Sequence, residues 1–209
     1  MHSIFSPDSK IMLALTGLAD LMILNLLFVA TCIPVFTIGA ASSALYTVCF
    51  RMIRQEEGHI ISGYLRSFRE NFRQGTGIWL ILLLLAAVGA LNLGWLDSIG
   101  GLMQTVMRLV TVMVLAILAF IHAYVFPLQS QFRNTVKATL SNAFLLSIGH
   151  LPRTMLITVL NLFPLGLLAV NLYTFLDSAL VWFVIYFSGT AFLNSLLLKK
   201  VFAPYMNPQ

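Results

Sequence analysis

A polar stretch from Arg51 to Gly75 lies between two long hydrophobic parts of the chain. It holds five of the twelve basic residues, together with three glutamates. In a membrane protein, a short loop rich in Lys and Arg stays on the cytoplasmic side and orients the helices beside it. This stretch therefore indicates both the class of the protein and its orientation.

The composition supports the same class. Hydrophobic residues make up 59% of the chain and charged residues 9%, whereas a soluble domain carries roughly 25% charged residues. A chain of 209 residues has room for about five or six spans, so we predict one integral membrane domain over residues 1–209. The net charge of +5 comes from loops beside hydrophobic spans, which suits an anionic inner leaflet. No nucleic-acid partner is expected.

The first hydrophobic run extends from Ile11 to about Ile53. As one straight helix of about forty residues it would reach roughly 60 Å, twice the thickness of the hydrocarbon core. Proline removes one backbone donor and clashes with the preceding turn, so we expect a break near Pro34. The run is therefore divided into a first span at about 12–33 and a second at about 36–53.

The second span is rich in small residues. Gly39 and Ser43, like Ala40 and Ala44, have the i, i+4 spacing that lets helix backbones approach closely. Residues 36–53 can also be read as a re-entrant or interfacial helix. The chain would then have five spans and an outer N-terminus, instead of six spans with both termini inside.

Residues 60–74 have the pattern of an amphipathic helix. Its apolar side carries Ile61, Tyr64, Leu65, Phe68 and Phe72. Its polar side carries Arg66, Arg69, Glu70 and Arg73. Such a helix lies on the inner membrane surface or docks a partner protein, and the pattern fits both readings. The residues expected to make that contact are Arg66, Phe68, Arg69, Phe72 and Arg73.

The remaining hydrophobic segments predict four more spans, at about 76–96, 105–127, 155–174 and 179–198. Loops 54–75 and 129–154 and the C-terminus are then cytoplasmic, and the second loop holds another, less charged amphipathic stripe. Eleven of the twelve Lys and Arg residues fall on this inner side, the exception being Arg108. This distribution follows the rule that positive loops stay inside.

The last four spans show an internal similarity. Residues 92–98 resemble residues 171–178, with one residue inserted. Two units of the same orientation, at about 60–128 and 132–205, would form a parallel repeat, an arrangement found in transporters. Chance similarity between apolar helices is the other explanation.

No catalytic motif is present. The sequence has no glycine-rich phosphate loop, no paired histidines at metal-binding spacing and no nucleophile elbow. Cys32 and Cys49 lie in apolar surroundings and are expected to be packing residues. We therefore expect no enzyme, and no catalytic, cofactor-binding or metal-binding residues.

Polar residues inside the predicted spans are the remaining candidates for a site. Under the six-span model Asp20, His122, Asn161 and Asn194 lie at similar depths in the inner third of the membrane. Such a layer binds a cation or relays a proton, or it joins helices through hydrogen bonds. Under the five-span model Asp20 moves to the outer side and the layer dissolves.

Several short motifs recur in one bacterial family. They are Phe5–Lys10, Asn25–Leu27, Pro34–Ala40, Ala44–Tyr46, Glu56–Gly58, Ser67–Phe68 and Asn71–Phe72. With them the chain resembles the YesL family of uncharacterised membrane proteins over nearly its whole length, most densely over residues 1–80. The resemblance implies several spans and, because the genes of members often lie beside genes for carbohydrate ABC importers, a link to sugar uptake. It implies no activity and no catalytic residues.

These observations predict an all-α fold, a polytopic bundle with one or two interfacial amphipathic helices. The leading hypothesis is a non-catalytic accessory or regulatory protein of the bacterial plasma membrane. Its partners would be the lipid bilayer and the permease subunits of an ABC transporter or another membrane protein. The alternative is a small-solute or ion transporter or channel that uses the polar layer.

Overall fold

The computed structural model describes residues 10–56, 58–96, 98 and 100–206, and every regular element in this part of the chain is helical. The elements are α1 (Lys10–Cys32), the 3₁₀ helix η1 (Val35–Thr37), α2 (Ile38–Ile53), α3 (Ile60–Leu96), α4 (Gly101–Gln131), α5 (Val136–Gly149), α6 (Leu151–Val170), α7 (Leu172–Asp177), α8 (Ala179–Val181), the π-helix η2 (Trp182–Tyr186) and α9 (Phe187–Met206). The predicted all-α class is confirmed.

Six helical segments of the described chain are long and apolar enough to cross a membrane. They are α1, η1 with α2, α3, α4, α6, and the continuous unit of α8, η2 and α9. A polytopic helical membrane protein is therefore supported, as the composition indicates. The side that each terminus faces, and with it the crossing of α2, stays a prediction.

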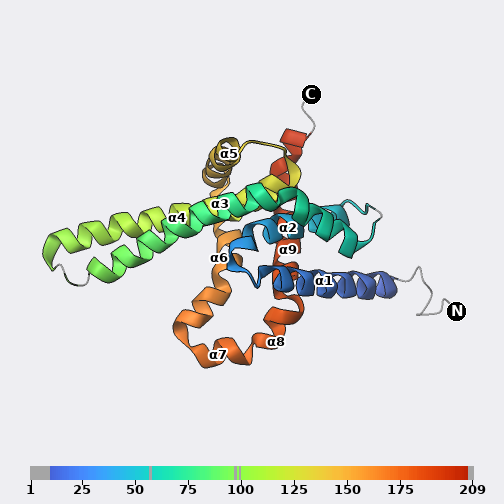
Figure 1. Ribbon diagram of the computed structural model, residues 1–209, viewed down its shortest axis with the longest axis horizontal. Coiled ribbons are helices and arrows are strands. Elements are labelled where there is room, and N and C mark those ends of the chain that lie inside the picture. The colour runs from blue at the N-terminus through green and yellow to red at the C-terminus, as the bar shows by residue number, and fades with distance from the viewer. Residues whose placement is uncertain (1–9, 57, 97, 99, 207–209) are drawn as a thin grey trace.

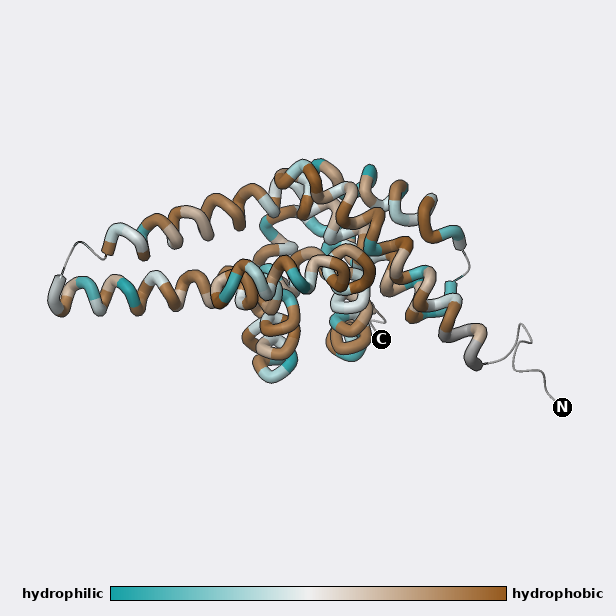
Figure 2. The backbone as a smooth tube through the Cα atoms, turned by 90° about the horizontal axis from the view of Figure 1, so that it is seen from below, coloured by the Kyte–Doolittle hydropathy of each residue, from teal (hydrophilic) through white to brown (hydrophobic). Residues whose placement is uncertain are grey.

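The long helices splay from a small core (Figure 1). The α3–α4 hairpin projects to one side of this core, and α1 leaves the core on the opposite side. The end of α6 together with α7 and α8 forms a second projection that points in a different direction from the α3–α4 hairpin. Both projections are mainly hydrophobic along their length (Figure 2). Much of the apolar surface thus lies outside the core, where lipid or another protein must cover it.

The central helix is α2, which packs against α1, α3, α4 and α9. Ten of its sixteen residues are buried, most of them small. At its crossing with α3, a Cβ atom on Gly75 would lie 2.9 Å from the backbone nitrogen of Ala40, and Gly39 faces the same contact. The predicted close approach of this small-residue helix to a neighbour is confirmed, and Gly75 is the residue that meets it.

α3 differs from the prediction because the amphipathic segment 60–74 and the third span form one helix. No proline interrupts residues 60–96, and Gly75 lies in the helix interior, against α2. At 1.5 Å per residue, these 37 residues extend over about 55 Å, far more than the roughly 30 Å of hydrocarbon. The amphipathic segment is therefore the end of a long helix, and its contact with a membrane surface stays a prediction.

The last two spans also have different bounds from those predicted. α6 ends at Val170, because Asn171 leaves the helix and its side chain accepts a hydrogen bond from the Tyr173 N–H at 2.8 Å. The last span begins at Ala179 but contains the π-helix η2, which widens the helix by one residue per turn.

The two units of the proposed repeat differ at their amphipathic segments. In the first unit the segment continues into the span as α3, whereas in the second α5 ends at Gly149 and α6 starts at Leu151. α5 has its own N-cap, Thr135, whose hydroxyl accepts a hydrogen bond from the Ala138 N–H. The duplication itself stays a prediction.

Candidate functional site

Two of the four predicted polar-layer residues are in direct contact. The Nδ2 group of Asn194 donates to Asn161 Oδ1 at 2.9 Å and to the hydroxyl of Tyr46 at 3.2 Å, joining α9 to α6 and α2. Asn194 is fully buried, and its Oδ1 atom has no hydrogen-bond partner among the described residues. The cluster has the geometry of interhelical hydrogen bonding and keeps one acceptor unused.

His122 of α4 lies near this cluster. It lines a cavity of about 170 Å³ together with Tyr46, Asn161 and Thr190. The rings of Trp79 and Phe126 pack against its imidazole, with centroid distances of 6.0 and 5.4 Å. The structure therefore gathers His122, Asn161 and Asn194 in one region. The cavity is smaller than the roughly 300 Å³ at which ligand pockets usually begin.

Asp20 is not part of this cluster. It is half-buried and forms no hydrogen bond or ion pair with any described residue. The residue of α1 that lines the cavity is Phe28, and eight residues at 1.5 Å each place Asp20 about 12 Å from it along the helix. Similar predicted depth was not enough to bring Asp20 to the other three residues.

The polar residue of α1 that does reach the core is Asn25, which is fully buried. Its Nδ2 group donates to the carbonyl oxygens of Trp182 and Phe183, at 2.9 and 2.7 Å. Its Oδ1 atom accepts from the Ser188 N–H at 2.9 Å. Asn25 thus binds backbone groups in and beside the π-helix η2. The predicted polar layer does not include Asn25, although a polar residue in an apolar run is a signal of burial.

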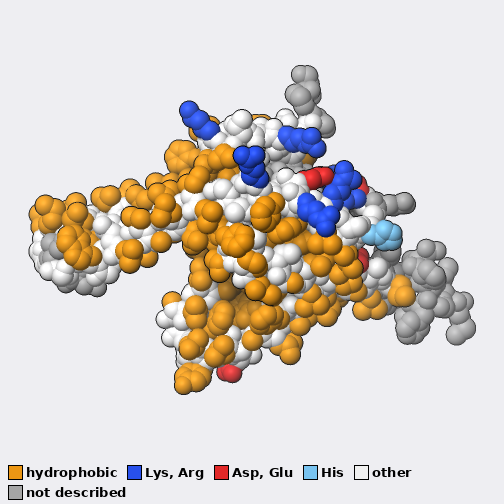
Figure 3. Space-filling model, in the orientation of Figure 1, with side chains coloured by type: hydrophobic (Ala, Val, Ile, Leu, Met, Phe, Trp, Pro, Cys, Tyr) orange, Lys and Arg blue, Asp and Glu red, His pale blue; other side chains and the backbone are white. Residues whose placement is uncertain are grey.

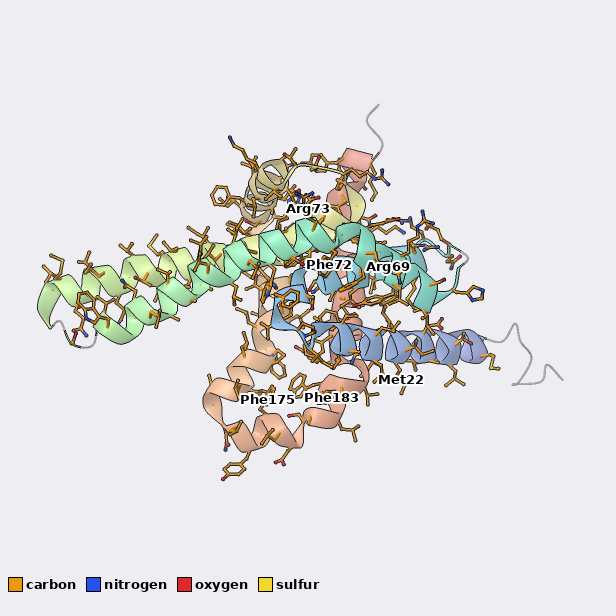
Figure 4. All side chains as sticks on the ribbon, viewed as in Figure 1. Met22, Arg69, Phe72, Arg73, Phe175 and Phe183 are labelled. Atoms are coloured by element: carbon orange, nitrogen blue, oxygen red, sulfur yellow. The ribbon has the colours of Figure 1, made fainter. Side chains whose placement is uncertain are left out.

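The five residues predicted to make a surface contact all lie on α3 and divide into two faces. Arg66, Arg69 and Arg73 are exposed, and Arg66 Nε donates to Glu70 Oε1 at 2.9 Å. Phe72 is 39% exposed, whereas Phe68 is half-buried and stacks near Tyr64, at a centroid distance of 6.4 Å. Figure 4 labels Arg69, Phe72 and Arg73 on the same part of α3.

The buried face of this segment is not the predicted apolar stripe. Tyr64, Ser67, Gly75, Ile78 and Leu82 are the buried positions of α3 before its last turn. Ile61 and Leu65 of the predicted stripe point outward, at 52% and 39% exposed, whereas Phe68 packs against the core. The segment thus keeps an exposed apolar face beside an exposed basic one.

Basic side chains gather on one side of the molecule, over the end of α3, α5 and the region near the C-terminus (Figure 3). The same side includes the turn after α2, where Arg54 pairs with Glu56 and donates to Gln131 Oε1 at 2.7 Å. This gathering agrees with the expected common side for loops 54–75 and 129–154.

The same side of the molecule holds a polar cavity that the sequence does not predict. It measures about 750 Å³ and lies between the N-terminal half of α3, the end of α4 and the α4–α5 linker, residues 132–135. Gln74 Nε2 donates to the Asn134 carbonyl oxygen at 2.8 Å and so ties α3 to the linker. The lining residues come from separate parts of the chain. In the sequence, each of them resembles an ordinary polar residue exposed to solvent, so the cavity is not indicated.

Among the described residues, no group of three or more His, Cys, Asp or Glu side chains could hold a metal ion. Cys49 is buried and Cys32 half-buried, and both are free thiols. Their surroundings are those of packing residues.

Comparisons with known proteins give one match to a family model. No curated protein and no solved structure matches the chain. The family match starts in α1 and ends in α3, so it includes Asn25, the Gly39–Gly75 crossing and the basic face of α3. Residues 21–93 match the model of the family described as "Protein of unknown function, DUF624".

Proposed function

We propose that this protein is a non-catalytic accessory protein of the bacterial plasma membrane, which docks another membrane protein through the N-terminal half of α3. The observation that carries the proposal is the pair of exposed faces on residues 60–74. Ile61, Leu65 and Phe72 are exposed apolar side chains, and three exposed arginines lie beside them.

These two faces suit a protein partner at a membrane boundary. A helix that only closed the core would bury its apolar residues, yet Ile61 is 52% exposed. Arginine pairs with carboxylates in two-point hydrogen bonds and is enriched in interfaces, as are aromatic residues. The partner would therefore present an acidic surface with an apolar centre to Arg69 and Arg73, since Arg66 pairs with Glu70.

The orientation belongs to the same proposal. With loops 54–75 and 129–154 and the C-terminus in the cytoplasm, this docking face lies at the inner membrane boundary. The resemblance to the YesL family favours a permease subunit of a carbohydrate ABC importer as the partner. Regulation of import would then follow from contact, with no chemistry carried out by this chain.

Site-specific photo-crosslinking in native membranes tests the docking. We place a photoreactive residue at Arg69 or Phe72, and a matched one at Leu84 on the exposed α3–α4 projection. A discrete protein adduct from positions 69 and 72, absent at 84 and identified by mass spectrometry as a membrane protein, is expected. Adducts with lipid alone at all three positions would contradict the proposal.

Charge variants sharpen the same experiment. Arg69→Gln with Arg73→Gln should abolish the adduct formed from position 72. Lys199→Gln with Lys200→Gln removes the same charge from exposed positions of α9 and should leave that adduct intact. Equal loss in both pairs would show that only general charge matters.

The orientation has its own test. In a chain with Cys32→Ala and Cys49→Ala, we place single cysteines at Ile33, Ser98 and Lys199, all of which are exposed. The six-span arrangement predicts labelling of Ile33 and Ser98 from outside intact cells, and protection of Lys199. Labelling of Lys199 from outside would overturn the orientation.

The cluster of Tyr46, Asn161 and Asn194 supports a second candidate, transport of a small solute or ion. The unused acceptor Asn194 Oδ1 and the neighbouring imidazole of His122 are groups that can bind a cation. Proteoliposomes loaded with a pH- or ion-sensitive dye test this candidate. Ion flux that is lost in Asn194→Leu would support transport, and flux equal to that of empty liposomes would exclude it for the ions used.

A further inference from the structure

The α4–α5 linker, residues 132–135, contributes to the lining of two cavities of opposite character. The polar cavity of about 750 Å³ is lined by Ser67, Asn71, Gln74, Gln129 and others. The second cavity measures about 280 Å³, and Leu128, Leu145 and Leu146 give it a mainly apolar wall. Phe132 and Asn134 line both cavities. A polar cavity and an apolar cavity thus share two of their lining residues.

The polar compartment is lined mostly by uncharged hydrogen-bonding side chains. Amides and hydroxyls dominate, and the two charged lining residues are Glu70 and Arg133. Glu70 already accepts a hydrogen bond from Arg66. Arg133 is exposed and makes no hydrogen bond or ion pair with a described residue. Of the two charged lining residues, Arg133 is therefore the one without a partner among the described residues.

Gln129 points to a ligand independently of the cavity volume. Gln129 is 7% exposed, and its Oε1 atom accepts a hydrogen bond from the Ser43 hydroxyl at 2.9 Å. Its Nε2 group is buried without a hydrogen-bond partner among the described residues. A buried donor without a partner is costly, and a bound acceptor removes that cost. Gln129 is one of the residues that line the polar cavity.

We propose that the linker and its two cavities bind one phospholipid with a hydroxylated headgroup, of the phosphatidylglycerol class. The glycerol hydroxyls occupy the polar cavity and accept a hydrogen bond from Gln129 Nε2. Arg133 pairs with the phosphate, and one acyl chain packs against Leu145 and Leu146 in the apolar cavity. The site would hold a lipid at the membrane boundary through the linker between two helices.

The chemistry favours this lipid over its common relatives. An ammonium headgroup needs a free carboxylate, and Glu70 is paired with Arg66. Phosphatidic acid satisfies Arg133 but leaves the amides and hydroxyls without a partner. A soluble glycerol phosphate would fill the polar cavity and leave the apolar one empty. The polar cavity shares the segment 60–74 with the docking face, but the lipid contacts proposed here are made by Gln129, Arg133 and Leu145, so the inference does not rest on the proposed function.

Native mass spectrometry of the purified, delipidated full-length protein tests the proposal. The probes are phosphatidylglycerol, phosphatidic acid and phosphatidylethanolamine with identical acyl chains, and glycerol 3-phosphate as the chain-free probe. Phosphatidylglycerol should bind tightest, about tenfold over each of the others, since each lacks one of the three contacts. Equal binding of phosphatidic acid would overturn the role of the hydroxyls. Binding of glycerol 3-phosphate equal to that of phosphatidylglycerol would show that the acyl chain does not contribute, and would contradict a lipid as the ligand.

Variants assign the contacts. Arg133→Gln should weaken phosphatidylglycerol binding about tenfold, whereas Lys137→Gln, an exposed charge on α5 that lines neither cavity, should leave it unchanged. Leu145→Asn should weaken all three lipids and leave glycerol 3-phosphate unaffected. Asn134→Ala keeps the backbone contact with Gln74 and provides a second test of the polar cavity if Gln129→Met fails to fold. Unchanged binding in Arg133→Gln, or in Asn134→Ala and Gln129→Met alike, would overturn the site.

Discussion

α2 and the α3–α4 hairpin are both apolar and helical, yet they have opposite surroundings. In the segment that contains α2, 61% of the residues are buried, compared with 11% and 22% in the most apolar segments of α3 and α4. The buried helix is also the least apolar of the six candidate spans, and α4 is the most apolar. In this protein the two most hydropathic helices are thus mostly exposed, as expected for contact with lipid, and the helix rich in small residues forms the core.

The physical reason is that lipid tails solvate apolar side chains as well as a protein interior does. Helices in a membrane therefore associate through close packing and hydrogen bonds, for which small and polar residues serve best. α2 has both, with Gly39 and Ala40 at its crossing with α3 and Ser43 bonded to Gln129. Substitutions should accordingly be costly around α2 and nearly neutral on the α3–α4 hairpin.

The largest expected effect is that of Gly75→Leu. Its side chain would meet the backbone of Ala40, and neither helix can move without disturbing the core. We expect a loss of about 3 kcal/mol or more, enough to prevent recovery of folded protein. Gly77→Leu is the matched control on the same helix, because a Cβ atom there has no contact within 4 Å. Size-exclusion profiles in detergent distinguish the two, and equal profiles would contradict the α2–α3 crossing.

Asn25→Leu should have the next largest effect. It removes two donors and one acceptor from backbone groups at η2, at an expected cost of about 2–3 kcal/mol. Asn92→Leu makes the same change on the projecting hairpin, where Asn92 accepts one bond from Thr111 at 3.0 Å, and should cost about 0.6 kcal/mol. Thermal unfolding in detergent micelles measures both. A cost at Asn92 equal to that at Asn25 would remove the distinction between core and projection.

The contact between Asn161 and Asn194 should contribute less. In a double-mutant cycle with Asn161→Leu and Asn194→Leu, we expect a coupling free energy of about 0.6 kcal/mol, typical of a hydrogen bond between membrane helices. The same thermal unfolding measurement gives the coupling. A value near zero would mean that the bond does not help to hold α6 against α9.

The smallest effects are expected on the lipid-facing side of the hairpin. Leu84 and Met113 are 65% and 64% exposed, so their replacement by Ala should change the free energy of unfolding by less than about 0.5 kcal/mol. Leu45→Ala on α2, where Leu45 is 3% exposed, should cost about 2–5 kcal/mol. Comparable losses at Leu84 and Leu45 would show that the hairpin packs against protein, as it would in an oligomer.

The sequence was informative where one local pattern decided the structure. Apolar length predicted the six candidate spans, and small residues predicted the close approach of α2. The change in polarity after Gly75 does not reveal that α3 is continuous, because polarity changes at a membrane surface without ending a helix. The break after Val170 depends on a side-chain cap from Asn171, which hydropathy does not register.

The candidate sites were harder to predict because they combine distant segments. His122, Asn161 and Asn194 came together as expected, since each is polar within an apolar span. Asp20 did not join them, because similar depth on a linear scale leaves rotation and tilt undefined. The polar cavity joins α3 to the end of α4 and the linker, and no pattern within any one of these segments indicates the others.

The π-helix η2 sets the rotation of α7 and α8, which precede it, about the axis of α9. One extra residue in a turn rotates the two flanking helical pieces relative to each other by about 100°. Removing a single residue between Trp182 and Tyr186 would therefore rotate α7 and α8 about the helix axis, while α9 remained packed on α2. Asn25 of α1 donates hydrogen bonds to two carbonyl groups of this π-helix. The position of α1 therefore determines the direction in which α7 and α8 project.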